Sequence, residues 1–449
     1  MYIQEDKCFV MKKSTGELVN VTFKKPVNCI LYNVYSNSSN IQSIEIPAAS
    51  SDFSCCMDEY DNSYVLYRDT DNTVSVTLIN AKSRFTFQTL KSKSLLRFPE
   101  HLNCLYVHGI LYIFFIVENN GTHLLAHQTL QMKPSQKAES GSISVPVTID
   151  NIIFEDSYSR PYGVVFDGKS DIYAFYSKSS QKPELGYKIL KGGTWGNFTP
   201  LSGISGIFSN PAAIADRKNT LHLIFQIKHT SVSSPKHSLM YMKILPDPSS
   251  GVTMDILHSS QSDFNNASIA LIDDIIYIYR VQNDQIFYMY SDSYGKTFRN
   301  YSRYSFPATG SLLCIKYFSN DSKDKTRIVS DTLPGTFSLK GINLAFVKPG
   351  RPITTGTSSP IKVFGSNVSA HTAGINQNVF PGKSPVKDTG RGDHAIQHNN
   401  TLSYENTLKL YEDMTELHQD MKSLYKDMSD LYKDIKFLIN RFYREKSTS

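Results

Sequence analysis

The stretch NASIALIDDIIYIYRVQNDQIFYMYSDSYGKTFRNY, residues 266–301, decides the fold that the sequence predicts. Apolar and aromatic residues nearly alternate in four short segments, as they do in half-buried strands. Polar, turn-forming residues separate these segments. We therefore expect antiparallel strands at 268–271, 275–280, 285–290 and 297–301, a meander of the size of one propeller blade.

Aromatic second strands of the same kind recur along the chain. They begin about 45 to 60 residues apart, which is the range expected of propeller blades with loop insertions. The clearest copies are Tyr64–Tyr67, Leu111–Phe114, Ile172–Phe175, Leu221–Phe225 and Ile276–Tyr279. A weaker sixth copy combines 312–315 with 327–329, and the alternating residues within 1–43 are expected to complete the last blade. The prediction is an all-β chain, with an about six-bladed β-propeller over residues 1–348.

The ends of the units agree as well. Segments 192–198 and 295–301 share the pattern Gly-x-Thr-aromatic-x-Asn-aromatic, and 251–254 is a poorer version of it. Through Ser291, Gly295, Thr297 and Phe298, the last unit resembles the Asp-box of sialidase-like propellers, with Ser293 where that family has Asp. In that family the box is a structural turn on the face away from the active site. The resemblance therefore implies the fold and gives these residues no catalytic role.

The composition changes after the propeller segment. Residues 349–400 are rich in Gly, Pro, Ser, Thr and Asn, and this composition predicts a flexible linker because it buries too little apolar surface to become ordered. Residues 401–445 then carry an apolar heptad pattern, with Leu at every d position and mainly Met at a. The predicted seam consists of Leu410, Met414, Leu417, Met421, Leu424, Met428, Leu431, Ile435, Leu438 and Phe442.

The positions beside the seam favour parallel association. Asp occupies the g positions (413, 420, 427 and 434), and mostly Tyr occupies e. An antiparallel pair would place Asp against Asp, whereas a parallel assembly lets each carboxylate accept a hydrogen bond from a Tyr hydroxyl. We expect a parallel dimer or trimer, since Met at a does not discriminate between them.

Composition limits the other partners and the compartment. A formal charge of +6 without a Lys/Arg run argues against nucleic acid. The N-terminus has no signal-peptide pattern, and no apolar run reaches the roughly 18 residues of a membrane span. We expect no membrane insertion, and a cytoplasmic location or assembly on a surface or particle by a non-secretory route. The six Cys have no zinc or disulfide-framework spacing and are expected to be free thiols.

The sequence predicts no catalytic residue, metal site or cofactor. A sialidase-like hydrolase would need an arginine cluster, an activated Tyr and a second acid. Arg97-Phe98-Pro99 is similar to that family's Arg-Ile/Leu-Pro motif, but it lies between two units. Further arginines follow no common spacing: Arg160, Arg280 and Arg327. Glycoside hydrolysis of the sialidase-like type remains an alternative function.

Three other motifs have simple structural explanations. His123 and His127 lie four apart, but in a segment expected to be a strand, so they do not form a metal pair. Asp69, Asp71 and the Asp273-Asp274 pair fit local turns better than calcium ligands. The tripeptide at 391–393, Arg-Gly-Asp, matches an integrin-type motif of a length that chance readily produces.

The preferred function is a multivalent binding or structural protein. A propeller head would recognise a glycan or protein ligand at its end loops or central channel, and a parallel coiled-coil stalk would display several heads together. A second alternative is an intracellular scaffold, whose coiled coil recruits a different heptad-bearing protein.

Overall fold

The structure of the chain is a computed structural model. It describes residues 7–347, apart from gaps at 36–40, 92–98, 133–140, 155–159, 202–206, 230–235, 247–251, 265–266, 283–284, 307–311 and 339–340 and at positions 182, 262, 300 and 326. The chain divides into two units, Met1–Ser366 and Asn367–Ser449. The predicted linker, the heptad seam and the tripeptide at 391–393 lie outside the described residues.

The first three meanders occupy residues 8–152. Each runs antiparallel from one strand to the next in chain order. The first contains β1 (Cys8–Lys12), β2 (Leu18–Lys24), β3 (Cys29–Tyr35) and β4 (Ile41–Ile46), with a short 3-10 helix, η1 (Lys25–Val27), before β3. The second contains β5 (Ala49–Met57), β6 (Ser63–Asp69), β7 (Thr73–Ile79) and β8 (Arg84–Lys91). The third contains β9 (Glu100–Val107), β10 (Ile110–Asn119) and β11 (Thr122–Met132), with β12 (Gly141–Ile143) and β13 (Val147–Ile152) both pairing with β11.

Three more meanders and a smaller C-terminal group follow. The fourth meander contains β14 (Tyr162–Phe166), β15 (Ile172–Lys178) and β16 (Glu184–Lys191), with β17 (Thr194–Trp195) and β18 (Thr199–Pro200) along its outer edge. The fifth contains β19 (Ile207–Ala215), β20 (Leu221–His229), β21 (Lys236–Ile244) and β22 (Val252–Ser260). The sixth contains β23 (Ser268–Ile272), β24 (Ile275–Gln282), β25 (Gln285–Ser291) and β26 (Ser302–Tyr304). The final group is β27 (Leu313–Ser319), α1 (Ser322–Lys325), β28 (Ile328–Ser330), β29 (Leu333–Ser338) and β30 (Gly341–Leu344).

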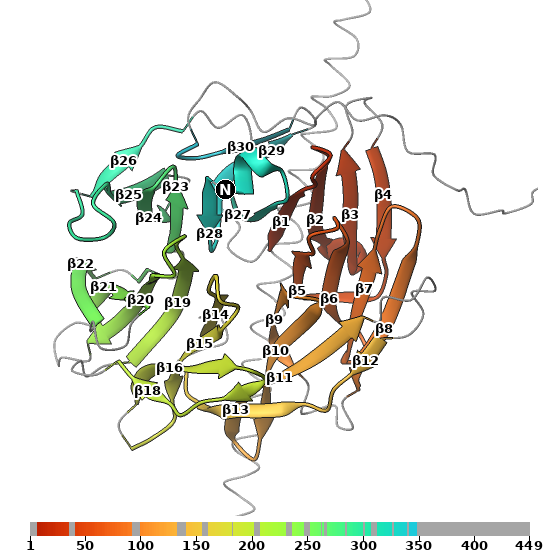
Figure 1. Cartoon of the computed structure of the whole chain (residues 1–449), viewed down its shortest axis with the longest axis horizontal. Helices are drawn as coiled ribbons and strands as arrows, with labels where there is room; N and C mark the ends of the chain where they lie inside the picture. The colour runs from red at the N-terminus through yellow and green to blue at the C-terminus, as the bar shows by residue number, and fades with distance from the viewer. Residues whose placement is uncertain are drawn as a thin grey trace, which may run out of the picture. The chain divides into compact units, whose positions relative to one another are not determined.

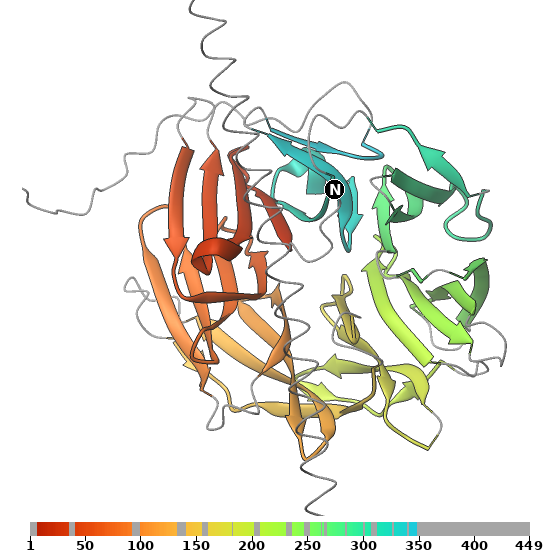
Figure 2. The same ribbon diagram turned by 180° about the vertical axis from the view of Figure 1, so that it is seen from behind.

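The meanders are arranged around a common centre. Their first strands, β5, β9, β14, β19 and β23, face the middle of the ring, and the later strands lie progressively further out (Figure 1). The same ring is seen from behind in Figure 2. This arrangement is a β-propeller, and the described part of the chain is all-β apart from α1 and η1.

The strand predictions for the sixth meander are correct at three of four positions. β23, β24 and β25 cover the predicted segments, and all five aromatic second strands lie within β6, β10, β15, β20 and β24. The fourth strand is wrong, because β26 begins at Ser302 and pairs its Ser302 with Tyr288. A turn stabilised by side chains occupies the residues after Ser291, so residues 297–299 are not free to extend as a strand.

The N-terminal strands do not merely complete the last blade. β1 to β4 form a meander of their own, and β1 also pairs in parallel with β27, with Cys8 opposite Ile315. The weak sixth copy is divided between two sheets, because β27 joins β1 whereas β28 pairs with β23. Repeat spacing carries no information about such pairing, since a parallel contact between distant ends leaves no local pattern.

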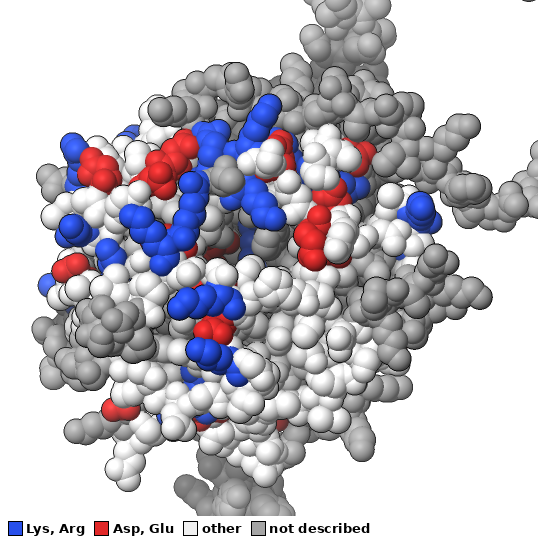
Figure 3. Space-filling view, in the orientation of Figure 1, with Lys and Arg blue, Asp and Glu red and all other residues white. Residues whose placement is uncertain are grey.

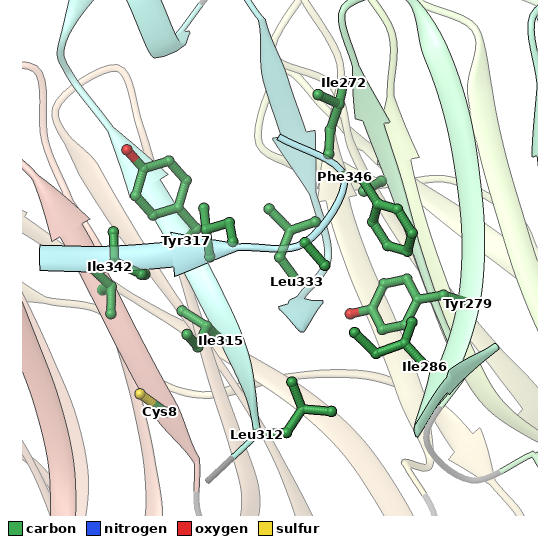
Figure 4. Packing of buried hydrophobic residues seen from close by; sticks show 14 of the residues in the cluster. Cys8, Ile272, Tyr279, Ile286, Leu312, Ile315, Tyr317, Leu333, Ile342 and Phe346 are labelled. Atoms are coloured by element: carbon green, nitrogen blue, oxygen red, sulfur yellow. The ribbon is translucent and has the colours of Figure 1, made fainter. Parts of the chain in front are cut away.

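Apolar packing reinforces this closure of the ring. One buried cluster combines Cys8 of β1 with Ile315 and Tyr317 of β27 and with Tyr279 and Ile286 of the sixth meander (Figure 4). Apolar side chains from the first and last strands are buried in one cluster, and this burial stabilises the closed ring. The propeller therefore depends on contacts between its first and last strands.

A buried ion cluster lies beside the same junction. Lys12 Nζ lies 2.7 Å from an Asp321 carboxylate oxygen and 2.9 Å from Asp324, and Tyr317 donates a hydrogen bond to Asp324. Burial raises the pKa of Asp321, but hydrogen bonds from Lys12 and the Lys323 backbone N–H outweigh it and hold that pKa below its ordinary value. The ammonium of Lys12 thus fixes the α1 turn onto β1.

Gly295 is required by both its backbone and its surroundings. Its φ is +74°, and a Cβ at this position would overlap the Tyr241 Oη. Ser291 Oγ accepts the Gly295 N–H at 2.9 Å, and Ser293 Oγ accepts the Thr297 N–H at 3.1 Å. Ser293 therefore performs at this turn the backbone capping for which an Asp side chain is also suited.

Within the described residues, no helix is both long and apolar enough to cross a membrane.

We predict that Lys12→Met lowers the free energy of unfolding by about 3 kcal/mol at pH 7, because it leaves two carboxylates without their cation. A carboxylate with a depressed folded pKa contributes stability above its unfolded pKa, and this contribution is lost as the pH falls through the folded value. The difference between variant and parent should therefore shrink below about pH 4. Urea unfolding of the full chain between pH 7 and pH 3 measures this difference.

As a control, Lys191→Met removes a cation that is 79% exposed and 3.9 Å from Asp171. This variant should change the free energy of unfolding by less than about 0.5 kcal/mol. Equal losses in the two variants would contradict the prediction.

We predict that Gly295→Ala destabilises the propeller by about 3 kcal/mol, because it adds a steric clash to an unfavourable left-handed φ. Gly193→Ala separates the two effects, since Gly193 has φ +82° with no atom within 4 Å of the added Cβ. This control should lose only about 1 kcal/mol. Unfolding midpoints in urea give both values, and a loss at Gly295 no greater than at Gly193 would exclude the clash.

Candidate ligand site at the centre of the ring

Charged and polar side chains of the inner strands meet at the middle of the ring. In a propeller each blade contributes its first strand to this region, so residues far apart in sequence become neighbours there. We define the central cluster as six partly exposed residues that come from β5, β9, β27 and the segments beside β1, β14 and β28: Lys7, Asp52, Asn103, Arg160, Lys316 and Asp331.

Asp52 joins the second and third meanders. Its carboxylate accepts a hydrogen bond from Lys7 Nζ at 2.9 Å and from the Leu102 backbone N–H at 3.1 Å. Burial raises the pKa of Asp52, but the charge and hydrogen bond of Lys7 outweigh it and lower the pKa overall. Asp52 is therefore a carboxylate at neutral pH and is already neutralised by Lys7.

Arg160 and Asp331 form a second ion pair across the ring. Arg160 Nη1 lies 2.6 Å from an Asp331 oxygen, although 171 residues separate them, and Ser268 donates to the same oxygen at 3.1 Å. The Arg160 side chain is 37% exposed and that of Asp331 is 17% exposed. Burial lowers the pKa of Arg160, and the neighbouring Asp331 charge more than offsets this. The pair thus connects the fourth meander with the C-terminal group.

Lys316 has a different environment from the other two cations. Its Nζ donates to Asn103 Oδ1 at 3.3 Å, and Ser54 donates to the same amide oxygen at 3.4 Å. No carboxylate oxygen of the described residues lies within 4.0 Å of this ammonium. Burial lowers the pKa of Lys316, and Arg160 lowers it further, whereas Asp331 and Cys104 act in the opposite direction without restoring it.

The central cluster consequently carries an excess of positive charge. Around Lys316, the two cations are Lys316 itself and Arg160 and the one carboxylate is Asp331, so the sum is 2 − 1 = +1. Lys and Arg side chains gather around the centre of one face of the ring, mostly over its upper half, with Asp and Glu side chains among them (Figure 3). Such a surface favours anionic ligands over cationic ones.

The arginines considered for a hydrolase do not converge with one another. Arg280 lies over the rings of Phe264 and Tyr301, and Arg327 makes a two-point ion pair with Asp273. Arg160 alone belongs to the central cluster, and Arg97 and Phe98 lie outside the described residues. Arg160, Arg280 and Arg327 thus have three separate structural contexts.

The histidines of the third meander are packed against aromatic rings. His123 contacts Phe154, and the His127 ring accepts a hydrogen bond from the Trp195 indole N–H at 3.1 Å. Burial lowers the pKa of His127. Over the described ranges, no three His, Cys, Asp or Glu side chains are grouped to hold a metal ion. All six cysteines are free thiols.

Aspartate turns form a repeat that the sequence patterns above miss. Asp58, Asp167 and Asp216 each accept backbone N–H groups two and four residues later through Oδ1. The other carboxylate oxygen then contacts the aromatic residue six positions on: Tyr64, Tyr173 and His222 respectively. The spacing Asp-x5-Tyr/His is visible in the sequence and marks the first turn of the second, fourth and fifth meanders.

The other acidic pairs are also turn residues. Asp69 accepts the N–H groups of Asp71 and Thr73. Asp273 and Asp274 have φ values of +49° and +65°, as a two-residue hairpin turn requires. Both acidic segments, Asp69 with Asp71 and Asp273 with Asp274, therefore form turns as predicted.

One buried chain of polar groups resembles a catalytic relay. His222 Nε2 lies 3.3 Å from Asp216, and its Nδ1 lies 2.7 Å from the Tyr241 hydroxyl. Both His222 and Tyr241 are 0% exposed, and burial raises the pKa of Tyr241 far above its ordinary value, with the Asp255 and Asp216 charges adding to the effect. A protonated phenol without access to solvent is suited to packing and poorly suited to nucleophilic attack.

The comparisons with known proteins concern the fold alone. No protein-family model and no curated protein matches the chain. Among solved structures it is similar to AofleA from Arthrobotrys oligospora, at 12% identity over 69% of this chain and 90% of that chain, with a TM-score of 0.40. It is also similar to a fungal lectin from Aleuria aurantia described as a six-bladed β-propeller, at 9% identity over 69% and 99% of the two chains, TM-score 0.40. The polysaccharide lyase Uly1 is similar at 9% identity over 67% and 81%, TM-score 0.44. The propeller assignment rests on the strand pairing described above.

We predict that Tyr241→Phe lowers the free energy of unfolding by about 1 to 2 kcal/mol, because it leaves a buried nitrogen of His222 without its partner. Ligand binding at the ring centre should not change. Urea unfolding and a binding titration on the same preparation test both statements. Lost binding with unchanged stability would instead give the Asp216, His222 and Tyr241 group a functional role.

Proposed function

We propose that this protein is a non-enzymatic, multivalent binding protein. The propeller head recognises a glycan or protein ligand at the centre of the ring, and a parallel coiled coil formed by residues 401–445 holds several heads together. The observation that carries the proposal is the partly exposed central cluster, in which separate blades bring their charged side chains to one place.

The chemistry of this cluster supports binding more than turnover. A retaining glycosidase needs a nucleophile and an acid whose ionisation suits each step. Two phenols lie close enough to the cluster to be affected by its carboxylates: Tyr162, which donates to the His101 carbonyl oxygen, and Tyr279, which bonds with Thr332 at 3.0 Å. Burial raises the pKa of both well above the ordinary value, so they remain protonated hydrogen-bond donors.

The heptad pattern supports display of several heads. Linking identical binding sites makes the second contact intramolecular, and the apparent affinity for a multivalent surface can rise by about 10² to 10⁴. The Asp and Tyr positions beside the seam favour a parallel arrangement, which leads the chains away from the stalk at the same end.

The test compares full-length protein with a variant of the seam. We expect Leu417→Asp with Leu424→Asp to reduce the mass in sedimentation equilibrium from a dimer or trimer to a monomer. Binding to an immobilised glycan and protein array should weaken by at least about tenfold, while the affinity for the same ligand free in solution stays the same.

The matched control is Gln419→Asp with Lys426→Asp. These f positions point away from the predicted seam, so the control should keep both the mass and the array binding. A monomeric parent protein would refute the stalk. Turnover of a fluorogenic sialoside that is lost in Arg160→Gln would refute the non-enzymatic function.

A further inference from the structure

We propose that the central cluster is a binding site for a singly charged oxyanion, a carboxylate or a sulfate ester, held between Lys316 and Arg160. This inference rests on the proposed function, because it assigns an acidic group to the ligand that the head recognises. The site combines residues of the third and fourth meanders with the C-terminal group.

Within the described residues, Lys316 is the cation of the central cluster that has no carboxylate oxygen within 4.0 Å. Lys7 and Arg160 each face a carboxylate at 2.9 Å or less, whereas Lys316 contacts the neutral amide oxygen of Asn103 at 3.3 Å. An ammonium withdrawn from water costs free energy unless a counter-charge is near. Burial accordingly lowers the pKa of Lys316, and an anion beside it would relieve that penalty.

The alternation of β27 places Lys316 on the opposite face of the strand from two buried apolar residues. Within β27, its neighbours Ile315 and Tyr317 are 0% and 5% exposed and pack into the core. Lys316 lies on the opposite face of the same strand, as Phe318 does, and its ammonium is 5.8 Å from that ring centre. The strand therefore directs the Lys316 ammonium away from Ile315 and Tyr317 and toward Asn103 of β9.

The charge balance selects a monoanion. With two cations, Lys316 and Arg160, and one carboxylate, Asp331, one bound negative charge neutralises the site, whereas a phosphate dianion would leave an excess of negative charge. Arg160 adds directional donors, because a guanidinium presents several N–H groups in a plane suited to carboxylates and sulfates. Asp331 already occupies one of these donors at 2.6 Å and so competes with the ligand.

The experiment measures anion binding to the full chain by isothermal titration calorimetry. The probes are D-glucuronate and methyl sulfate, and D-glucose serves as the neutral match for glucuronate. We expect glucuronate or methyl sulfate to bind with a Kd of about 1 mM, and glucose to bind at least about tenfold more weakly. Tighter binding of glucuronate would identify the anionic group of the ligand as a sugar carboxylate, and tighter binding of methyl sulfate would identify it as a sulfate ester. Equal binding of glucose and glucuronate would overturn the proposal.

Two variants change the charge in opposite directions. Lys316→Met should weaken anion binding by at least about tenfold, and Asp331→Asn should strengthen it by about threefold or more because a competing carboxylate is lost. Lys243→Met is the matched control. Its ammonium also faces a neutral oxygen, the Tyr294 carbonyl at 2.9 Å, but on a third strand away from the ring centre, and its removal should leave binding unchanged.

The stronger binding expected of Asp331→Asn still tests the proposal if Lys316→Met does not fold. Weaker binding in Asp331→Asn at an unchanged unfolding midpoint would overturn the site, because loss of a competing negative charge from a folded anion site should strengthen binding. The array in the previous subsection separates the two proposals. If Lys316→Met keeps its array ligand but loses the anion, the proposed function stands and the assigned acidic group is wrong. If the array ligand and the anion are lost together, both are supported.

Discussion

The parallel pairing of β1 with β27 is the contact on which the rest of the structure depends. Without it, the first meander would have an open inner edge and the last strands would have no sheet to join. It brings Lys12 to the α1 turn and places β27 beside the ring centre. Because this pairing joins the two ends of the described chain, its loop-closure cost is the highest in the fold, and the shared apolar cluster offsets that cost.

The fold was largely predictable because each blade repeats a local pattern. Alternating aromatic strands such as 276–279 are determined by burial on a pleated sheet, which depends on nearby residues. The fourth strand of the sixth meander was misplaced, since the hydrogen bonds of Ser291 and Ser293 hold the chain in a turn for longer than the alternation indicates. Local side-chain capping competed with strand extension at that point and won.

The candidate site was much less predictable for a different reason. Of its six residues, only Arg160 was singled out from the sequence, and it was considered for another chemistry. Lys316 and Asn103 are 213 residues apart, and nothing local connects them. The one available signal was a lysine within the otherwise apolar and aromatic strand LCIKYFS, where strand burial alone would favour an apolar residue.

That lysine also links ring closure with binding. The position of its ammonium is determined by the register of β27 on β1, where Lys316 lies opposite Phe9, so a shift of one residue would turn the charge into the core. The register therefore has two effects: it closes the propeller, and it determines which side chain reaches the centre. The proposed oxyanion, bound beside Lys316, would stabilise the closed ring by mass action. Ligand binding and ring closure should consequently reinforce each other, because both depend on the same strand.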